Sequence, residues 1–486
     1  MSIKILSCSF ALALISILMT FPISAQQLIA ATGGRAAGFD PSCAQIAGVA
    51  TDSRAVRPGE LFWALRGENH DGHSFVRDAW SRGAAACVIE SAAPNADGPT
   101  IEVSNTLHAL WDVAGWWRHQ HDALVIGVTG STGKTTTRAT IHTALESSFT
   151  GMQSPKNYNN HVGLPLSVLD ITEGDEFAVL ELGASQTGEI RDLAAIAQPE
   201  IGVVTSVGLA HVSSFGSLEQ ITAAKRELIE ALPAGGFAVL AGDDPRVRSM
   251  AAAAACRVLF VGEGGDNDLQ ACDIEVTRNQ LSFRVEGRRY AMPATGRHHV
   301  VAALSAIAIG REVGANDSDV ADGLHNYIPV PGRCQLEEIG PWTVIDDTYN
   351  ANPSSMQAAC RVLADWDGFG KRILVAGDML ELGDSTAACH RQFGRWAAEA
   401  QIDRLLVYGD HGRHVMGGAL EAGLPAHCLA ECEDFDALLA VLDCCLDEGD
   451  VVLVKGSRAL HMERVIQWLR SQSTGEHQTK GLVAAA

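Results

Sequence analysis

The sequence predicts an α/β protein of three domains, in which a small mixed α/β unit precedes two units built on parallel sheets. Three observations support this prediction. The chain has 486 residues, and a domain usually takes about 150. Near-continuous apolar strands alternate with helical segments between residues 123 and 457, which is typical of doubly wound parallel sheets. Before residue 120 the expected strands are short and separated by turn residues.

The first predicted domain spans residues 19–120. The run AACVIE (85–90) predicts a strand, and VRPGELFWAL (56–65) predicts a turn that leads into another. The segment HSFVRDAWSRGAA (73–85) predicts a helix that Gly83 closes. This mixture indicates a small α/β domain.

The second and third predicted domains span residues 121–329 and 330–472. Buried strands of the second are expected at 123–130, 177–184, 201–208 and 237–244, with helices between them that include 217–232 and 300–314. Strands of the third are expected at 342–349, 372–379, 404–410 and 450–457. Residues 473–486 are polar and then end LVAAA, so we expect a frayed tail.

The segment GVTGSTGKTTT (127–137) follows an expected strand and opens a helix, which is the context of a phosphate-binding loop. Its glycines let backbone N–H groups turn towards a polyphosphate, Lys134 supplies a charge to the β- and γ-phosphates, and Thr135 offers Mg²⁺ a hydroxyl. Val128 departs from the usual Walker pattern, which has Gly there. The segment still predicts binding of a nucleoside triphosphate. The residues expected at the nucleotide are Gly130, Ser131, Thr132, Gly133, Lys134, Thr135 and Thr136.

Polar residues follow several of the expected strands. Glu181 ends one strand at the sheet edge where ligands bind in open α/β folds, so it is a candidate Mg²⁺ ligand; a solvated loop position is the alternative. A lone histidine such as His211 is more often packed or on the surface than a ligand. Lys225 lies on an expected helix and, taken alone, indicates a solvated face, while Asp346 and Asp347 are compatible with a turn.

Composition excludes two classes of partner. The formal net charge of -22 repels nucleic acid and anionic membranes. The 12 cysteines form no CxxC pair and no zinc-finger spacing, so we expect reduced, mostly buried thiols. We therefore expect a cytoplasmic protein with neither a nucleic-acid partner nor a membrane span.

Together these segments resemble the Mur ligase family over about residues 19–469. GSTGKTT (130–136), LELGASQTGEI (180–190) and VGLAHVSSFGSLEQITAAKREL (207–228) are similar to its central domain and follow its order. TDSRAVRPGELFWALRGENHDGHSF (51–75) resembles its UDP-substrate domain. DDTYNANP (346–353) is the most specific segment and resembles the member that adds D-alanyl-D-alanine. The resemblance implies a UDP-substrate domain, a central ATP-binding domain with a P-loop-type parallel sheet, and a Rossmann-like C-terminal domain.

The resemblance also implies an activity. The expected enzyme is an ATP-dependent ligase that joins D-alanyl-D-alanine to UDP-N-acetylmuramoyl-tripeptide through an acyl phosphate, for peptidoglycan synthesis. ATP and Mg²⁺ are the expected cofactors, and the protein is expected to be a monomer. The alternatives are a sister Mur ligase that adds diaminopimelate or lysine, a folate polyglutamate ligase, an ATP-binding protein that has lost catalysis, and a secreted binding protein.

Metal-site roles come from the same resemblance. It implies that Thr135 and Glu181 hold a first Mg²⁺ and that His211 binds a second. It also implies that CO₂ carbamylates Lys225, which turns a cation into an anionic metal ligand. The expected catalytic residues are Lys134, Glu181, His211, Lys225 and Arg333.

Substrate contacts are implied in the same way. Arg333 and Asp347 would reach the nucleotide as the C-terminal domain closes. The family often has two asparagines near adenine where this chain has His299 and Ala302, although His298 matches, so the adenine contacts stay open. The expected substrate-binding residues are Asp52, Ser53, Arg54, Asn160, Tyr349, Asn350, Asn352, Lys455 and Arg458.

Residues 1–25 allow two interpretations. Lys4, an apolar run and then Ile23-Ser24-Ala25 are similar to a signal peptide. However, the family resemblance begins at Met19, and both ATP and a UDP-linked precursor are cytoplasmic. We therefore interpret residues 1–18 as an over-long start. N-terminal sequencing of the native protein tests this, and Gln26 as the first residue would contradict it.

Overall fold

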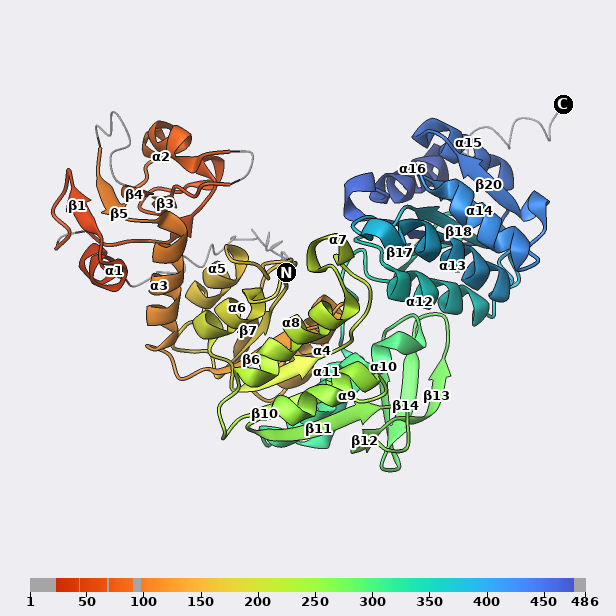
Figure 1. Cartoon of the computed structure of the whole chain (residues 1–486), viewed down its shortest axis with the longest axis horizontal. Coiled ribbons are helices and arrows are strands. Elements are labelled where there is room, and N and C mark those ends of the chain that lie inside the picture. Colours follow the sequence, from red (N-terminus) through yellow and green to blue (C-terminus); the bar gives the residue numbers. More distant parts are fainter. Residues whose placement is uncertain (1–22, 43, 68–69, 91–97, 476–486) are drawn as a thin grey trace, which may run out of the picture. The chain divides into compact units, whose positions relative to one another are not determined.

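The computed structural model describes residues 23–475 except 43, 68–69 and 91–97. The chain forms two compact units, residues 1–116 and 117–486 (Figure 1). The interpretation of residues 1–18 lies outside the described residues. So does most of the expected tail, of which Ser473–Gly475 belong to a helix instead. Within the described ranges, no helix is both long and apolar enough to cross a membrane.

The first unit contains a five-stranded sheet of order β1-β5-β4-β3-β2. Its strands are β1 (Arg35–Ala37), β2 (Val49–Ala50), β3 (Leu61–Trp63), β4 (Ala86–Glu90) and β5 (Thr100–Val103), and only β1 is antiparallel to its neighbour. Its helices are α1 (Ala25–Thr32), α2 (Val76–Ser81) and α3 (Thr106–Arg118). The helix expected at 73–85 is therefore shorter than predicted, because a 3₁₀ turn precedes α2 and Gly83 follows it with φ +96.

The second unit begins with a seven-stranded sheet of order β12-β11-β10-β9-β6-β8-β7, in which every pairing is parallel. The strands are β6 (Leu124–Thr129), β7 (Gly151–Gln153), β8 (Phe177–Glu181), β9 (Ile201–Val204), β10 (Phe237–Ala241), β11 (Arg257–Gly262) and β12 (Leu269–Gln270). Apolar side chains alternate between two cores, because Val239 belongs to the same buried cluster as Leu304 whereas Leu240 belongs to that of Ile221. This sheet is the doubly wound sheet that the sequence predicts.

Helices cover both faces of this sheet (Figure 1). One group packs together as α4 (Lys134–Glu146), α10 (Val300–Glu312) and α11 (Asp317–His325). The other consists of α5 (Gly163–Leu169), α6 (Glu189–Ala197) and α8 (Leu218–Glu230), with the short α7 (Val212–Phe215) and α9 (Pro245–Ser249) beside α8. The α8 helix agrees with the segment predicted at 217–232, and the side chain of Ser217 caps it by accepting a hydrogen bond from the Gln220 amide.

A small antiparallel sheet, which the sequence analysis did not predict, follows β12. It consists of β13 (Cys272–Val276), β14 (Leu281–Val285) and β15 (Arg288–Met292). Its strands alternate polar and apolar residues, and Leu281, Phe283 and Tyr290 join the core of α4 and α10.

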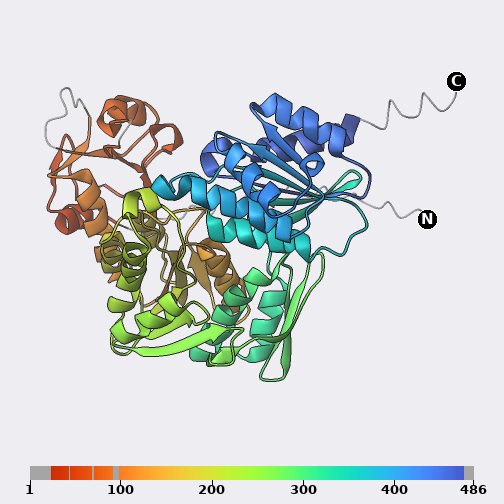
Figure 2. The same cartoon turned by 45° about the vertical axis from the view of Figure 1, so that its right-hand side comes forward.

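The remainder of the second unit is a six-stranded sheet of order β16-β17-β21-β18-β19-β20, antiparallel only between β16 and β17. The strands are β16 (Gln335–Ile339), β17 (Trp342–Asp347), β18 (Arg372–Gly377), β19 (Arg404–Tyr408), β20 (Leu429–Cys432) and β21 (Val451–Lys455). On one face lie α12 (Pro353–Ala364), α13 (Thr386–Glu399) and α14 (Gly412–Glu421), and on the other α15 (Phe435–Cys445) and α16 (Glu463–Gly475) (Figures 1 and 2). Each predicted domain thus contains its own main sheet, while the boundaries at 120 and 329 stay predictions.

Candidate active site

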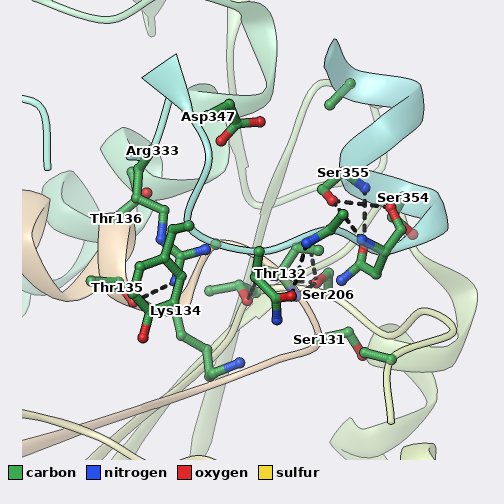
Figure 3. A pocket seen from close by; sticks show the side chains of 18 of the residues that line it. Ser131, Thr132, Lys134, Thr135, Thr136, Ser206, Arg333, Asp347, Ser354 and Ser355 are labelled. Atoms are coloured by element: carbon green, nitrogen blue, oxygen red, sulfur yellow. Dashed lines mark hydrogen bonds between the residues drawn. The ribbon is translucent and has the colours of Figure 1, made fainter. Parts of the chain in front are cut away.

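A cavity of about 770 Å³ lies in the second unit, where the loops at the carboxyl ends of β6, β8 and β9 face those that follow β17 and β21. The phosphate loop at 131–137 forms one side, and Arg333, Asp347 and the start of α12 form another (Figure 3). A second cavity of about 370 Å³ shares Lys134 and His211 with the first. The structure therefore brings the residues predicted at the nucleotide into one place.

The phosphate loop depends on two glycines. Gly130 has φ +150, and a β-carbon there would lie 2.0 Å from Thr205 Oγ1. Gly133 has φ +82 and stands directly before α4, so its backbone conformation opens the helix N-terminus. The ammonium of Lys134 donates a hydrogen bond to the Gly130 carbonyl at 2.8 Å. Burial lowers the pKa of Lys134, while the charge of Glu181 opposes that change. An anion in the cavity would provide the charge partner that this lysine needs.

Glu181 is the buried acid of the site, with only 1% of its surface exposed. Its carboxylate accepts hydrogen bonds from Thr135 Oγ1 at 2.9 Å and from Asn159 Nδ2 at 2.7 Å, and the Arg138 guanidinium lies 3.7 Å away. The solvated-loop alternative for Glu181 is therefore wrong. The hydroxyl oxygen of Thr135, in the first turn of α4, therefore lies next to the carboxylate oxygens of Glu181, at the end of β8. That set suits a Mg²⁺ ion, which prefers oxygen ligands.

Lys225 is also buried, at 3% exposure, so its interpretation as a solvated helix face is wrong. Burial, together with the nearby charge of Lys134, lowers its pKa to about 7, although neighbouring glutamates oppose the shift. One of these, Glu227, already accepts hydrogen bonds from the Gly188 and Arg191 amides. Lys225 lines the smaller cavity together with Asn160. The site thus holds an amine that is largely neutral just above pH 7.

His211 lies on the wall between the two cavities. It has φ +54, directly before α7, and its Nδ1 pairs with the Glu381 carboxylate from the loop after β18. That glutamate was not predicted. One imidazole nitrogen is thus already engaged, and a metal ion would have to use the other nitrogen or displace Glu381.

The carboxyl ends of β17 and β21, together with the segment before β16, form a charged wall. Lys455, at 2% exposure, donates to Asp347 Oδ2 at 2.7 Å and to the Asn350 carbonyl at 2.9 Å. The Arg333 guanidinium lies 3.9 Å from the centre of the Tyr349 ring. Its Nη2 also lies 3.5 Å from Thr135 Oγ1. The residues predicted around the nucleotide and the dipeptide therefore share one cavity.

The other predicted residues of this wall stabilise local backbone structure or line the cavity. Asp346 accepts hydrogen bonds from the amide and hydroxyl of Thr348, as the turn interpretation predicts. Asn352 caps α12 by accepting from the Ser355 amide at 2.9 Å. Arg458 lines the cavity and pairs with Glu463.

Three predicted substrate residues belong to the first unit. Asp52 accepts hydrogen bonds from the Arg54 amide at 2.9 Å and from its guanidinium at 2.7 Å. The Arg54 side-chain hydrogen bond lowers the pKa of Asp52 to about 2. Ser53 is buried and is the first residue of a short 3₁₀ helix, Ser53–Ala55, which Asp52 caps and which contains Arg54. The carboxylate of Asp52 thus holds the exposed guanidinium of Arg54 in one orientation.

Several residues of the site and its surroundings were not predicted from the sequence. Asn159 and Arg138 hold the carboxylate of Glu181, and Ser206 Oγ accepts from the Thr132 amide at 3.0 Å. Asn159 lies inside the segment NYNNHVG, next to the predicted Asn160. His299 and Ala302, where the sequence departs from the family pattern, were singled out from the sequence, and both are buried in the cavity wall.

Known protein families and relatives match most of this chain. Three family models match: the Mur ligase family catalytic domain at residues 45–115, the Mur ligase middle domain at 128–310 and the Mur ligase glutamate ligase domain at 332–458. A Bacillus subtilis protein named UDP-N-acetylmuramoyl-tripeptide--D-alanyl-D-alanine ligase is 37% identical over 87% of this chain and 93% of its own length. An Escherichia coli protein of the same name is 36% identical over 88% of this chain and 94% of its own length.

Solved structures give the same result. A crystal structure of MurF from Acinetobacter baumannii superposes with a TM-score of 0.86 at 30% identity, over 93% of this chain and 99% of that chain. MurF from Thermotoga maritima, crystallised in complex with ADP, superposes with a TM-score of 0.78 at 28% identity, over 88% of this chain and 97% of that one. Family models and relatives thus cover most of the sequence, and the chain belongs to the Mur ligase family.

Proposed function

We propose that this enzyme uses ATP to join D-alanyl-D-alanine to UDP-N-acetylmuramoyl-tripeptide, the reaction for which its curated relatives are named. The observation that carries the proposal is the buried pair of Thr135 and Glu181 beside Lys134, in a cavity whose other wall holds Arg333 and Asp347. This arrangement supplies an oxygen-rich metal position, a cation for the phosphates and a second cation across the cavity. The product is the UDP-linked pentapeptide of peptidoglycan synthesis.

The reaction has two steps. In the first, an oxygen of the tripeptide's terminal carboxylate attacks the γ-phosphorus of ATP, and the bond to the leaving ADP breaks. In the second, the neutral amine of D-alanyl-D-alanine attacks the carbonyl carbon of the acyl phosphate. The tetrahedral intermediate expels phosphate, and the amine proton passes to solvent or base.

Charge is the main obstacle to the first step, because a carboxylate must approach a triphosphate. Lys134 at the helix N-terminus and Arg333 across the cavity provide positive charge where negative charge accumulates. The hydrogen bonds of Glu181 to Thr135 and Asn159 hold its carboxylate in one orientation. The positioning of these groups, rather than a protein nucleophile, is what the site contributes.

Thr135 and Glu181 fit the Mg²⁺ that this chemistry needs, because both present oxygens at the start of α4. When bound, the ion neutralises the phosphoryl charge. A second metal position would use His211 and Lys225. The pKa of about 7 leaves Lys225 with a free lone pair near neutrality, which attacks CO₂, loses a proton and becomes an anionic carbamate.

Phosphate release by the full-length chain tests the proposal. The substrates are Mg-ATP and UDP-muramoyl-tripeptide with D-alanyl-D-alanine, compared with UDP-muramoyl-dipeptide and either diaminopimelate or lysine. We expect release only with D-alanyl-D-alanine, loss in Lys134→Ala and no loss in Lys156→Ala, whose side chain is exposed. Release with a single amino acid would instead identify a sister ligase, which the names of the relatives do not favour.

Two further expectations stay predictions. Sedimentation velocity would test whether the protein is a monomer, and fractionation of the native cells would test the cytoplasmic location. A stable dimer in the first measurement, or enrichment outside the cytoplasm in the second, would contradict them.

A further inference from the structure

Two histidines and a cysteine meet on the wall of the larger cavity. Each offers one atom, a ring nitrogen of His298, a ring nitrogen of His299 and the sulfur of Cys334, and these atoms all lie within 4.8 Å of one another. The histidines form the 3₁₀ turn before α10, and Cys334 follows Arg333 just before β16. No sequence spacing predicts this cluster, because the chain between the histidines and the cysteine folds away through α10 and α11.

His299 is the unusual member. It is only 4% exposed, and neither of its ring nitrogens has a hydrogen-bond partner. Buried polar atoms in proteins are nearly always paired, so two such atoms on one side chain need an explanation. A ligand that binds a ring nitrogen of His299 would provide this explanation.

The protonation states suit a metal. Burial holds the pKa of His299 well below its usual value, so this ring is neutral near pH 7. Neutral imidazole is the form that binds metal ions. Burial raises the pKa of the Cys334 thiol, so a metal ion that binds there must displace its proton to solvent.

We propose that His298, His299 and Cys334 form a binding site for Zn²⁺ that is separate from the oxygen site at Thr135 and Glu181. Two imidazoles and a thiolate are a donor set typical of zinc, whereas Mg²⁺ prefers oxygen. Donor atoms around tetrahedral zinc lie roughly 3.4–3.6 Å apart, as follows from bond lengths of about 2.0–2.3 Å. The present separations of up to 4.8 Å need a contraction of about 1 Å, which side-chain rotation can supply. All three residues line the larger cavity.

A bound ion would tie the start of α10 to the segment that carries Arg333. Figure 3 shows Arg333 on the cavity wall above the phosphate loop. The proposal does not depend on the ligase reaction, because it concerns binding of the ion alone.

Titration of metal-free, full-length protein with Co²⁺, a spectroscopic substitute for Zn²⁺, tests the site. We expect one equivalent to produce a thiolate-to-Co²⁺ charge-transfer band, and Zn²⁺ to abolish that band by displacing Co²⁺. The oxygen site at Glu181 has no thiolate, so Co²⁺ bound there does not give this band. Cys334→Ser should remove the band, and His299→Asn should weaken Co²⁺ binding by at least about tenfold. The matched control is Cys272→Ser, which removes an exposed cysteine on β13 and should keep the band.

Three outcomes would overturn the proposal: no band in the wild-type protein, an unchanged band in Cys334→Ser, or loss of the band in Cys272→Ser. Circular dichroism checks that each variant is folded. If Cys334→Ser does not fold, the His299→Asn titration decides, and an unchanged Co²⁺ affinity in that variant refutes the site.

Discussion

Replacing Lys225 with methionine should stabilise the metal-free protein while it abolishes ligation. An exposed lysine has a pKa near 10.5, and burial lowers that of Lys225 to about 7. The unfolded chain therefore binds more protons than the folded one between these values, so this residue makes stability rise with pH there. Well below pH 7 the lysine is charged in both states, and its burial lowers the free energy of unfolding by ~5 kcal/mol. At pH 9 it lowers the free energy of unfolding by only ~2 kcal/mol. Lys225→Met removes the charge and keeps the length of the side chain.

Pulse proteolysis in urea, with the peptides of α8 quantified by mass spectrometry, measures the stability of the part that carries Lys225. Buffers at pH 6 and pH 9 are kept free of metal and bicarbonate, so that the lysine stays unmodified. The stability gain of Lys225→Met over wild type should be larger at pH 6 by ~3 kcal/mol. Arg226→Met is the control, because Arg226 is exposed and pairs with Glu230 at the helix surface.

Equal gains at the two pH values, or no gain at either, would refute the reasoning. That result would mean that Glu189 and Glu227 compensate the buried ammonium and keep Lys225 charged in the folded protein. In the ligase assay, Lys225→Met should be inactive although it is more stable, which separates the catalytic role of this lysine from a structural one.

Three shorter predictions concern other contacts. Gly130→Ala should abolish ADP binding in calorimetry, because the added β-carbon would lie 2.0 Å from Thr205 Oγ1 and displace the loop; unchanged affinity would contradict this. Lys455→Met should destabilise the protein by ~3–5 kcal/mol in thermal unfolding, since it leaves the Asp347 carboxylate without its partner, and adding Asp347→Asn should recover much of the loss; additive losses would refute the pairing. Arg54→Ala should raise the KM for the UDP-linked substrate severalfold with little change in kcat, and a fall in kcat alone would argue against a binding role for Arg54.

The sequence determined the local elements of this protein. The strands at Leu124–Thr129 and Phe237–Ala241 and the helix from Leu218 follow from apolar runs, helical periodicity and a serine cap, which act over a few residues. The phosphate loop was predictable for the same reason, because its glycines, its lysine and its helix are contiguous in the chain. The antiparallel sheet at 272–292 was not predicted, because its partly exposed strands lack the continuous apolar runs that mark the strands of the parallel sheets.

Only the tertiary structure decided the chemical state of the site residues. From the sequence Glu181 and Lys225 were compatible with solvated positions, yet segments distant in the chain bury both of them and lower the pKa of the lysine. The pairing of Asp347 with Lys455 and the meeting of His299 with Cys334 likewise join residues on different elements. Desolvation and Coulomb energy depend on which groups surround a charge in space, and that arrangement exists only once the sheets have folded and packed.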